Sequence, residues 1–319
     1  KEGVLFFKNR QGGIFPYAPL SSEQQTTNIL TFAPPGGGKS VLISTLILAA
    51  IFDPVLEGLP KIAAIDIGNS SKGVINLLRE ISPPDMRDRF MHVEFELNER
   101  FGINVMDTRV GCQKPTSAER GFLTNFLTLV LTPVGSTEPI QDATQIATML
   151  IDELYTVCAE DNPTKYIDGQ DKLTTAWLQN QRDFEVNKST TWWQVVYFAM
   201  SKKAYDVAGS AQRFAVPSLK MMPSRLAMSD SLKTLYGQDN PILVDAKRLI
   251  LGFIQQYPSL CKPSNFNFQE TDVCIIDLNK VTQDTGPEGT RRTTIAYMVS
   301  RYLLGKDFLT NKDILNEMP

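Results

Sequence analysis

The chain has 319 residues, of which 42% are hydrophobic and 21% charged, and its formal net charge is −3 at pH 7. This length suits one large α/β domain or two domains. The charge balance excludes a chain that binds nucleic acid or a membrane surface over its whole area, so any contact with a polyanion must be local.

The four cysteines are widely spaced and contain no C-x-x-C pair. This spacing argues against a structural zinc site or a disulfide framework and fits a reducing cytosolic setting. No apolar run reaches the length of a membrane span. Because the chain begins at Lys1 without a methionine, we expect it to be a piece of a longer protein.

The first predicted element is a hairpin at the edge of a sheet, made of two apolar runs, Val4–Phe7 and Ile14–Tyr17, on either side of a Gly-Gly turn. Further along, Ile29–Phe32 has the pattern of a buried strand and Val41–Ile51 that of a helix rich in Leu, Ile and Ala. Between them, Ala33–Ser40 reads APPGGGKS, which fits the phosphate-binding (Walker A) pattern with Ala in place of the first Gly.

The residue types in this loop suit a phosphate ligand. Consecutive glycines let backbone N–H groups turn toward an anion, and the following helix adds the positive end of its dipole. We expect Lys39 to lie along the β- and γ-phosphates of ATP and the Ser40 hydroxyl to coordinate Mg²⁺. The predicted binding residues are Pro35, Gly36, Gly37, Gly38, Lys39, Ser40 and Val41. The alternative is a glycine-rich turn without a ligand.

A second buried strand, Lys61–Asp66, ends in a carboxylate. Ligands of open α/β sheets lie at the carboxyl ends of strands, so Asp66 is either a site carboxylate facing the phosphates or a capping residue of the next loop. The following strand, Met91–Phe95, carries His92, which is the only histidine of the chain. With no second histidine and no nearby cysteine, we expect it to pack the strand rather than to bind a metal or act in catalysis.

From Thr116 the pattern changes to helix. Thr116–Glu119 and Thr191–Gln194 both have the sequence of a capping box, and a helix is expected from about Glu138 to Glu160. The segment from Thr116 to about Pro263 contains little strand character and is predicted to be an all-helical insertion. A strand returns at Asp272–Asp277, followed by a helix over 290–304.

A nucleotide hydrolase of this kind needs a second strand that ends in Asp-Glu, which holds Mg²⁺ and activates water. Asp152-Glu153 has the right residues, but its neighbours recur at helical spacing. Asp277 ends a strand and is a candidate Mg²⁺ ligand, but no Glu follows it. We therefore expect the acidic pair to lie beyond Pro319, and this piece to bind nucleotide without complete hydrolytic machinery.

Several motifs in order resemble the motor ATPases of type IV secretion and conjugation, in the FtsK–HerA group. They are APPGGGKS at 33–40, IAAIDIGNSSKG at 62–73, GINVMD at 102–107, VCIIDLNKV at 273–281 and RRTTIAYMVSRYL at 291–303. The resemblance implies an α/β fold with a RecA-like P-loop NTPase sheet and a large helical insertion. The implied domains are the N-terminal half of the nucleotide-binding core at 1–115, the insertion at 116–263, and the return to the core at 264–319.

The same resemblance implies ATP and Mg²⁺ as cofactors and assembly as a homo-hexamer. It also implies a cytoplasmic, peripheral position at the inner face of the bacterial inner membrane, with other secretion-system ATPases and inner-membrane channel components as partners. In such rings a neighbouring subunit supplies an arginine to the γ-phosphate. Arg291 and Arg292 are candidates for it by position, and the alternative for both is the solvated start of a helix.

The function implied is an ATP-driven motor that energises export of protein or nucleoprotein. Two alternatives stay open. One is an assembly scaffold gated by nucleotide, with little hydrolysis of its own. The other is a DNA-translocating motor, for which the sequence offers only the clusters Lys202-Lys203, Lys220 with Arg225, and Arg291-Arg292.

Overall fold

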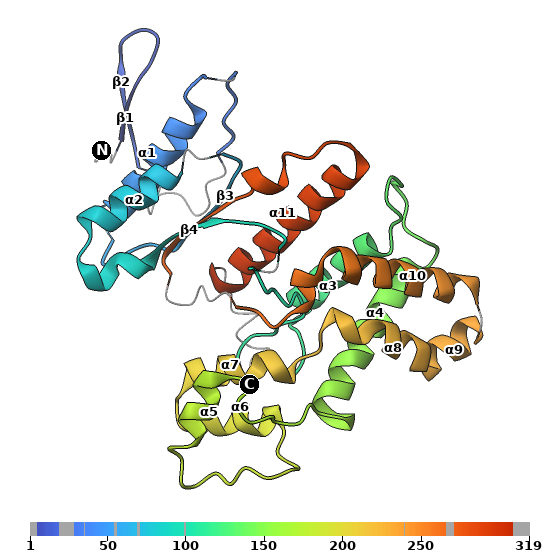
Figure 1. The fold of residues 1–319 in the computed structure, drawn as a ribbon. Helices are drawn as coiled ribbons and strands as arrows, with labels where there is room; N and C mark the ends of the chain where they lie inside the picture. The colour runs from blue at the N-terminus through green and yellow to red at the C-terminus, as the bar shows by residue number, and fades with distance from the viewer. Residues whose placement is uncertain are drawn as a thin grey trace. The chain divides into compact units, whose positions relative to one another are not determined.

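The computed structural model describes residues 5–18, 29–34, 36–53, 56–68, 71–98, 100–238, 240–265 and 271–308. The contacts between residues divide the chain into two compact units. We call Lys1–Phe95 with Phe268–Lys280 the sheet unit, and Glu96–Asn267 with Val281–Pro319 the helical unit. Figure 1 labels the helices α1–α11 and the strands β1–β4.

The sheet unit contains three parallel strands in the order β3-β5-β4, namely β3 (Ile62–Asp66), β5 (Val273–Asp277) and β4 (Phe90–Glu94). The central strand β5 is buried at every position, as parallel strands between covered faces are. Helices α1 (Lys39–Ile51) and α2 (Lys72–Ile81) contribute side chains to one apolar cluster with these strands, and a short 3₁₀ helix over Pro84–Arg89 leads into β4.

The register of this sheet places three carboxylates at one edge. Asp66 of β3 lies opposite Asp277 of β5, and Glu94 of β4 lies opposite the same residue. All three residues end their strands, so their side chains share the carboxyl edge of the sheet.

The prediction of a strand over Ile29–Phe32 is wrong. Residues 29–34 have no regular structure, and Leu30 and Phe32 are 82% and 86% exposed. A four-residue apolar run becomes a strand only when a partner strand bonds its backbone, and none of the described strands pairs with it. The helix that follows is confirmed as α1, and Ala49 is its one buried residue.

The predicted N-terminal hairpin is confirmed, but its predicted position at the edge of a larger sheet is not. The strands β1 (Leu5–Lys8) and β2 (Ile14–Tyr17) pair antiparallel and form a sheet of their own, rather than the edge of a larger one. Asn9 shapes the turn, because its Oδ1 accepts the backbone N–H of Gln11 at 3.0 Å and that of Gly13 at 2.8 Å.

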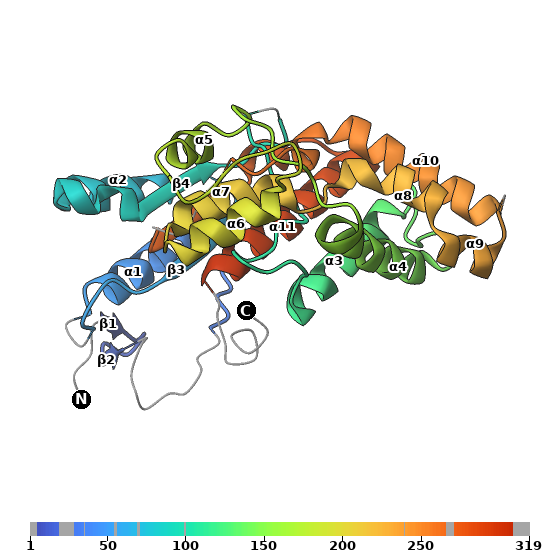
Figure 2. The ribbon, with the colours of Figure 1, turned by 90° about the horizontal axis from the view of Figure 1, so that it is seen from below.

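The helical unit consists of helices and loops, as predicted for residues 116–263. Between residues 117 and 261 the structure describes no strand, only an isolated bridge from Lys165 to Thr191. The helices are α3 (Ser117–Val130), α4 (Ala143–Thr156), α5 (Lys172–Leu178), α6 (Trp192–Ser201), α7 (Tyr205–Ala215), α8 (Met222–Met228), α9 (Asp230–Tyr236), α10 (Pro241–Gln256) and α11 (Gly286–Phe308). Figure 2 shows α3, α4, α8 and α10 grouped together, and α6 packs on α7.

Both predicted capping boxes are confirmed. The Thr116 hydroxyl accepts the N–H of Glu119 at 3.3 Å, and the Glu119 carboxylate accepts the N–H of Thr116 at 2.8 Å. Thr191 and Gln194 exchange the same two bonds at 3.3 and 2.9 Å. These bonds satisfy backbone donors that a helix N-terminus otherwise leaves without partners.

The boundaries between the two units lie at other residues than the predicted domain boundaries. Residues 96–115 belong to the helical unit, and so does α11, which was expected to return to the nucleotide-binding core. Within the helical unit α11 packs on α3, where the rings of Phe122 and Tyr302 stack with centroids 3.9 Å apart and an interplanar angle of 3°. Among the described residues, every helix is too short or too polar to cross a bilayer.

Candidate functional site

The loop before α1 contains two glycines with left-handed backbone angles. Gly36 and Gly38 have φ angles of 76° and 84°, and Gly38 immediately precedes the first residue of α1. Side-chain-bearing residues rarely adopt these angles, so both positions require glycine. A Cβ on Gly37 would lie 2.9 Å from both the Cβ of Ala33 and the carbonyl oxygen of Pro34, so this position also excludes a side chain.

The side chain of Lys39 folds back over this loop. Its Nζ donates to the carbonyl oxygens of Ala33 at 2.5 Å and Pro34 at 3.2 Å. The N–H of Gly37 also bonds the Pro34 carbonyl, at 3.0 Å, which closes the turn. The ammonium is therefore held at the loop before any anion arrives.

The surroundings of the loop fit a phosphate group. A Cβ on Gly36 or Gly38 would meet no atom of the described residues within 4 Å, so these residues leave this side of the loop open. Ser40 and Val41 are exposed in the first turn of α1, which contains no acidic residue to repel an anion. Backbone N–H groups, one ammonium and one hydroxyl suit a phosphate with its Mg²⁺ ion. Pro35, the remaining predicted binding residue, lies outside the described residues.

The two strand-end aspartates bond to neighbouring turns. Oδ1 of Asp66 accepts the N–H of Ile67 at 2.9 Å, and Oδ2 accepts the hydroxyl of Ser71, the residue before α2. Of the two roles predicted for Asp66, these contacts are those of a capping residue. Asp277 is 3% exposed, and its Oδ1 accepts the N–H of Gly68 at 3.1 Å and that of Asn279 at 2.8 Å. It therefore ties the turns after β3 and β5 together.

Glu94 completes this edge, and the sequence reasoning missed it. Its carboxylate forms ion pairs with Lys72 at 2.8 Å and Lys280 at 3.2 Å. Hydrogen bonds from these two ammonium groups lower the pKa of Glu94 to about 2, and the bond from Lys72 has the largest effect. The position of Glu94 one residue before the end of the predicted strand Met91–Phe95 was the available signal.

The described residues of this edge form no cluster of metal ligands. Burial lowers the pKa of the nearby His92, so the neutral imidazole is favoured, consistent with the packing role predicted for it. No group of three or more His, Cys, Asp or Glu side chains among the described residues could hold a metal ion. Asp277 therefore lacks a ligand cluster around it, and its role toward Mg²⁺ stays a prediction.

Asp152 and Glu153 lie in the middle of α4, which confirms that they do not end a strand. Asp152 forms an ion pair with Arg120, with N–O distances of 2.5 and 2.8 Å. Glu153 accepts bonds from Arg225 Nε and the Ser229 hydroxyl, both at 2.6 Å. These contacts join α4 to α3 and α8, which is a structural role within the helical unit.

The two candidate trans arginines differ. The guanidinium of Arg291 donates to the carbonyl oxygens of Thr132 at 2.5 Å, Val130 at 3.2 Å and Leu129 at 3.3 Å, at the C-terminal end of α3. Burial lowers its pKa, so the alternative of a solvated helix start is wrong for this residue. The side chain of Arg292 is 42% exposed and forms an ion pair with Asp284. A trans role stays a prediction for both.

Comparisons with known proteins give one coarse likeness. No family model matches the sequence, and no curated protein matches it. Among solved structures, the chain is similar to VirB4 of Thermoanaerobacter pseudethanolicus, with 16% identity and a TM-score of 0.44. The match covers 96% of this chain, which spans 65% of the length of that one. A likeness at this level assigns no residue and no activity to the present chain.

Proposed function

We propose that this chain is the nucleotide-binding part of an ATP-driven motor that energises export of protein or nucleoprotein through a type IV secretion system. The observation that carries the proposal is the loop before α1. Its two glycines have left-handed backbone angles, its lysine ammonium lies on the loop, and a helix N-terminus follows directly. These features together favour a phosphate ligand.

In the proposed complex the backbone N–H groups of Gly36–Ser40 and the Lys39 ammonium bind the phosphates of ATP, and the Ser40 hydroxyl coordinates Mg²⁺. Bound Mg²⁺ neutralises charge on the phosphate oxygens. The ordered motifs from the loop to 291–303 most resemble the component DotO, also called IcmB, of the Dot/Icm apparatus. On that basis we further propose a hexamer at the cytoplasmic face of the inner membrane, in contact with channel components and other motor ATPases.

The scaffold gated by nucleotide is the second candidate. It is favoured by the engagement of the strand-end carboxylates, since Asp66 and Asp277 bond turns and Glu94 bonds two lysines. No described strand ends in an Asp-Glu pair, so the general base is missing from this part of the chain. Such a loss commonly slows turnover by about 10²–10⁴-fold.

The DNA-translocating motor has less support. Of its basic clusters, Lys202 is paired with Asp183 and Arg225 with Glu153. Arg291 is engaged by the end of α3. Contacts of this kind leave few cations to form a stripe along a phosphate backbone.

Binding of Mg-ATP to the Lys39→Ala variant tests the proposal. We expect affinity to fall about 10- to 100-fold, because the loop loses its charged donor to the phosphates. Lys247→Ala is the matched control, since it removes the same charge from an exposed position on α10 in the other unit. Equal affinities of the parent, Lys39→Ala and Lys247→Ala would show that the loop does not bind the nucleotide.

Phosphate release at saturating ATP then separates the motor from the scaffold. A motor requires slow release by this chain and faster release by a longer chain that extends past Pro319, where the acidic pair is expected. If the longer chain binds ATP but releases phosphate no faster, the scaffold is favoured. Sustained turnover by the present chain would contradict the expectation that the hydrolytic machinery is incomplete.

A further inference from the structure

The helical unit contains a pocket. It has a volume of about 570 Å³ and is lined by residues of α3 and α11 and by Arg109, from the segment that precedes α3. Ligand pockets in proteins commonly have volumes of about 300–1,000 Å³, apolar walls and a few convergent polar groups. None of the predicted nucleotide-binding residues contributes to this pocket.

The charged side chains of the lining are mostly positive. Arg109, Arg301 and Lys306 line the pocket, with Glu119 as the one carboxylate among the lining residues. This excess contrasts with the net charge of −3 of the whole chain, so it is local. A pocket with this balance attracts an anion.

The carboxylate pairs with one of these cations. Oε1 of Glu119 forms an ion pair with Nε of Arg109 at 3.6 Å, and its other oxygen bonds the capping-box N–H of Thr116. Arg301 is exposed and forms no hydrogen bond or ion pair with any described residue. The Lys306 ammonium donates only to backbone carbonyls, at 3.1 Å each. Arg301 and Lys306 are therefore available to an added anion.

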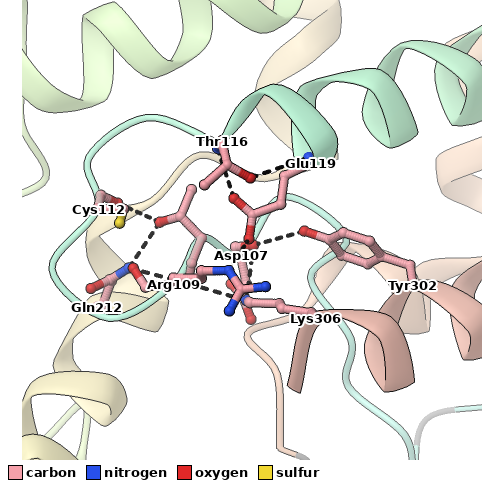
Figure 3. A network of polar contacts seen from close by, with 9 residues as sticks. Asp107, Arg109, Cys112, Thr116, Glu119, Gln212, Tyr302 and Lys306 are labelled. Carbon is pink, nitrogen blue, oxygen red and sulfur yellow. Dashed lines mark hydrogen bonds and ion pairs between the residues drawn. The ribbon is translucent and has the colours of Figure 1, made fainter. Parts of the chain in front are cut away.

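The segment that carries Arg109 is held from several helices. Gln212 of α7 donates to the Thr108 hydroxyl at 2.8 Å and accepts the N–H of Gly111 at 2.7 Å. The hydroxyl of Tyr302 and the ammonium of Lys306, both on α11, donate to the carbonyl oxygen of Asp107. Figure 3 shows these side chains converging on the segment from different elements. A wall fixed in this way loses little entropy when a ligand binds.

Flat rings form part of the lining. Phe122 of α3 and Tyr302 of α11 stack face to face on each other, and Tyr297 of α11, which also lines the pocket, is 48% exposed. The exposed ring of Tyr297 is the one that can stack on the base of a nucleotide, because every base presents a flat π surface. The lining therefore combines a stacking surface with sites for an anion.

We propose that this pocket binds a nucleoside phosphate, with its base on the ring of Tyr297 and its phosphate at Arg301 and Lys306. The site is separate from the loop of Ala33–Ser40 and uses other residues. The inference does not depend on the function proposed for that loop.

The test uses AMP as the probe and the Lys39→Ala chain as the parent, so that the loop contributes little. We expect saturable binding by calorimetry that weakens about 10-fold in Arg301→Ala, through loss of a charge-assisted bond. Lys306→Met is expected to weaken it to a similar extent. Arg248→Ala is the matched control, since it removes an exposed arginine on α10 whose ion pair is with Asp245.

Two further ligands test separately how the nucleoside and the phosphate of AMP contribute to binding. Adenosine lacks the phosphate and inorganic phosphate lacks the base, so both should bind at least 10-fold more weakly than AMP. The proposal is overturned by absence of saturable AMP binding, by equal binding of AMP and either part, or by unchanged affinity in Arg301→Ala and Lys306→Met. Circular dichroism spectra matching the parent ensure that a loss of binding is not a loss of folding.

Discussion

Replacement of Arg291 by alanine should destabilise the helical unit. The guanidinium donates to three carbonyl oxygens at the end of α3, and only the bond to Thr132, at 2.5 Å, is short. A hydrogen bond to a charged group contributes about 1.5–3 kcal/mol, and a cation at a helix C-terminus adds about 0.3–1 kcal/mol. Because the bonds to Leu129 and Val130 are long, we take the total loss as about 3 kcal/mol rather than the sum of three full bonds.

Thermal unfolding followed by far-UV circular dichroism measures this loss. For units of 150–250 residues each kcal/mol shifts the midpoint by about 2–4 °C, so Arg291→Ala should lower it by about 6–12 °C. The adjacent Arg292→Ala is the matched control. It removes an ion pair in which Arg292 and Asp284 have side chains 42% and 56% exposed, and such pairs contribute about 0–1 kcal/mol.

The reasoning is refuted if the two variants unfold at the same temperature, or if Arg292→Ala is the less stable one. A trans arginine would behave differently from both expectations. Its loss would reduce phosphate release in the assembled ring and leave the unfolding temperature of the separate chain unchanged.

Two further predictions concern carboxylates. Glu153→Gln should lower the free energy of unfolding by about 1 kcal/mol through its weakened bond to Arg225, and leave phosphate release unchanged; a selective loss of turnover would restore Glu153 as a catalytic candidate. Glu94→Gln should reduce stability at neutral pH, because the pKa of Glu94 in the folded state is lowered from its usual 4.5 to about 2. The stability that this carboxylate contributes is complete above about pH 4.5 and is lost as the pH falls toward 2. The free energies of unfolding of variant and parent, measured in urea, should therefore converge over that range. A constant difference between them would contradict the assignment.

Local sequence patterns correctly predicted the features that depend on residues close together in the chain. The helix after the glycine loop, both capping boxes and the helical setting of Asp152-Glu153 were expected and are present. Each depends on bonds or periodicity within a few residues, and the printed sequence contains all of that information. The glycines at positions 36 and 38 belong to the same class, since their φ angles are a local requirement of the turn.

The misjudged features depend on residues far apart in the sequence. An apolar run such as Ile29–Phe32 satisfies the strand pattern, but burial needs a partner strand, and the described structure leaves Phe32 exposed. Arg291 meets Thr132 across 159 residues of sequence, so no local pattern could show that it caps α3.

The sequence by itself thus determined the glycine-rich turn before α1, the helical character of residues 116–263 and the apolar strand that ends at Asp277. Only the tertiary structure decided which carboxylates of the sheet edge are engaged and that α11 packs with α3. It also assembled the cationic pocket of Arg109, Arg301 and Lys306 from segments that are distant in sequence. The physical reason is that turns and helices form through short-range backbone bonds, whereas ion pairs, ring stacks and pockets need the long-range packing of separate elements.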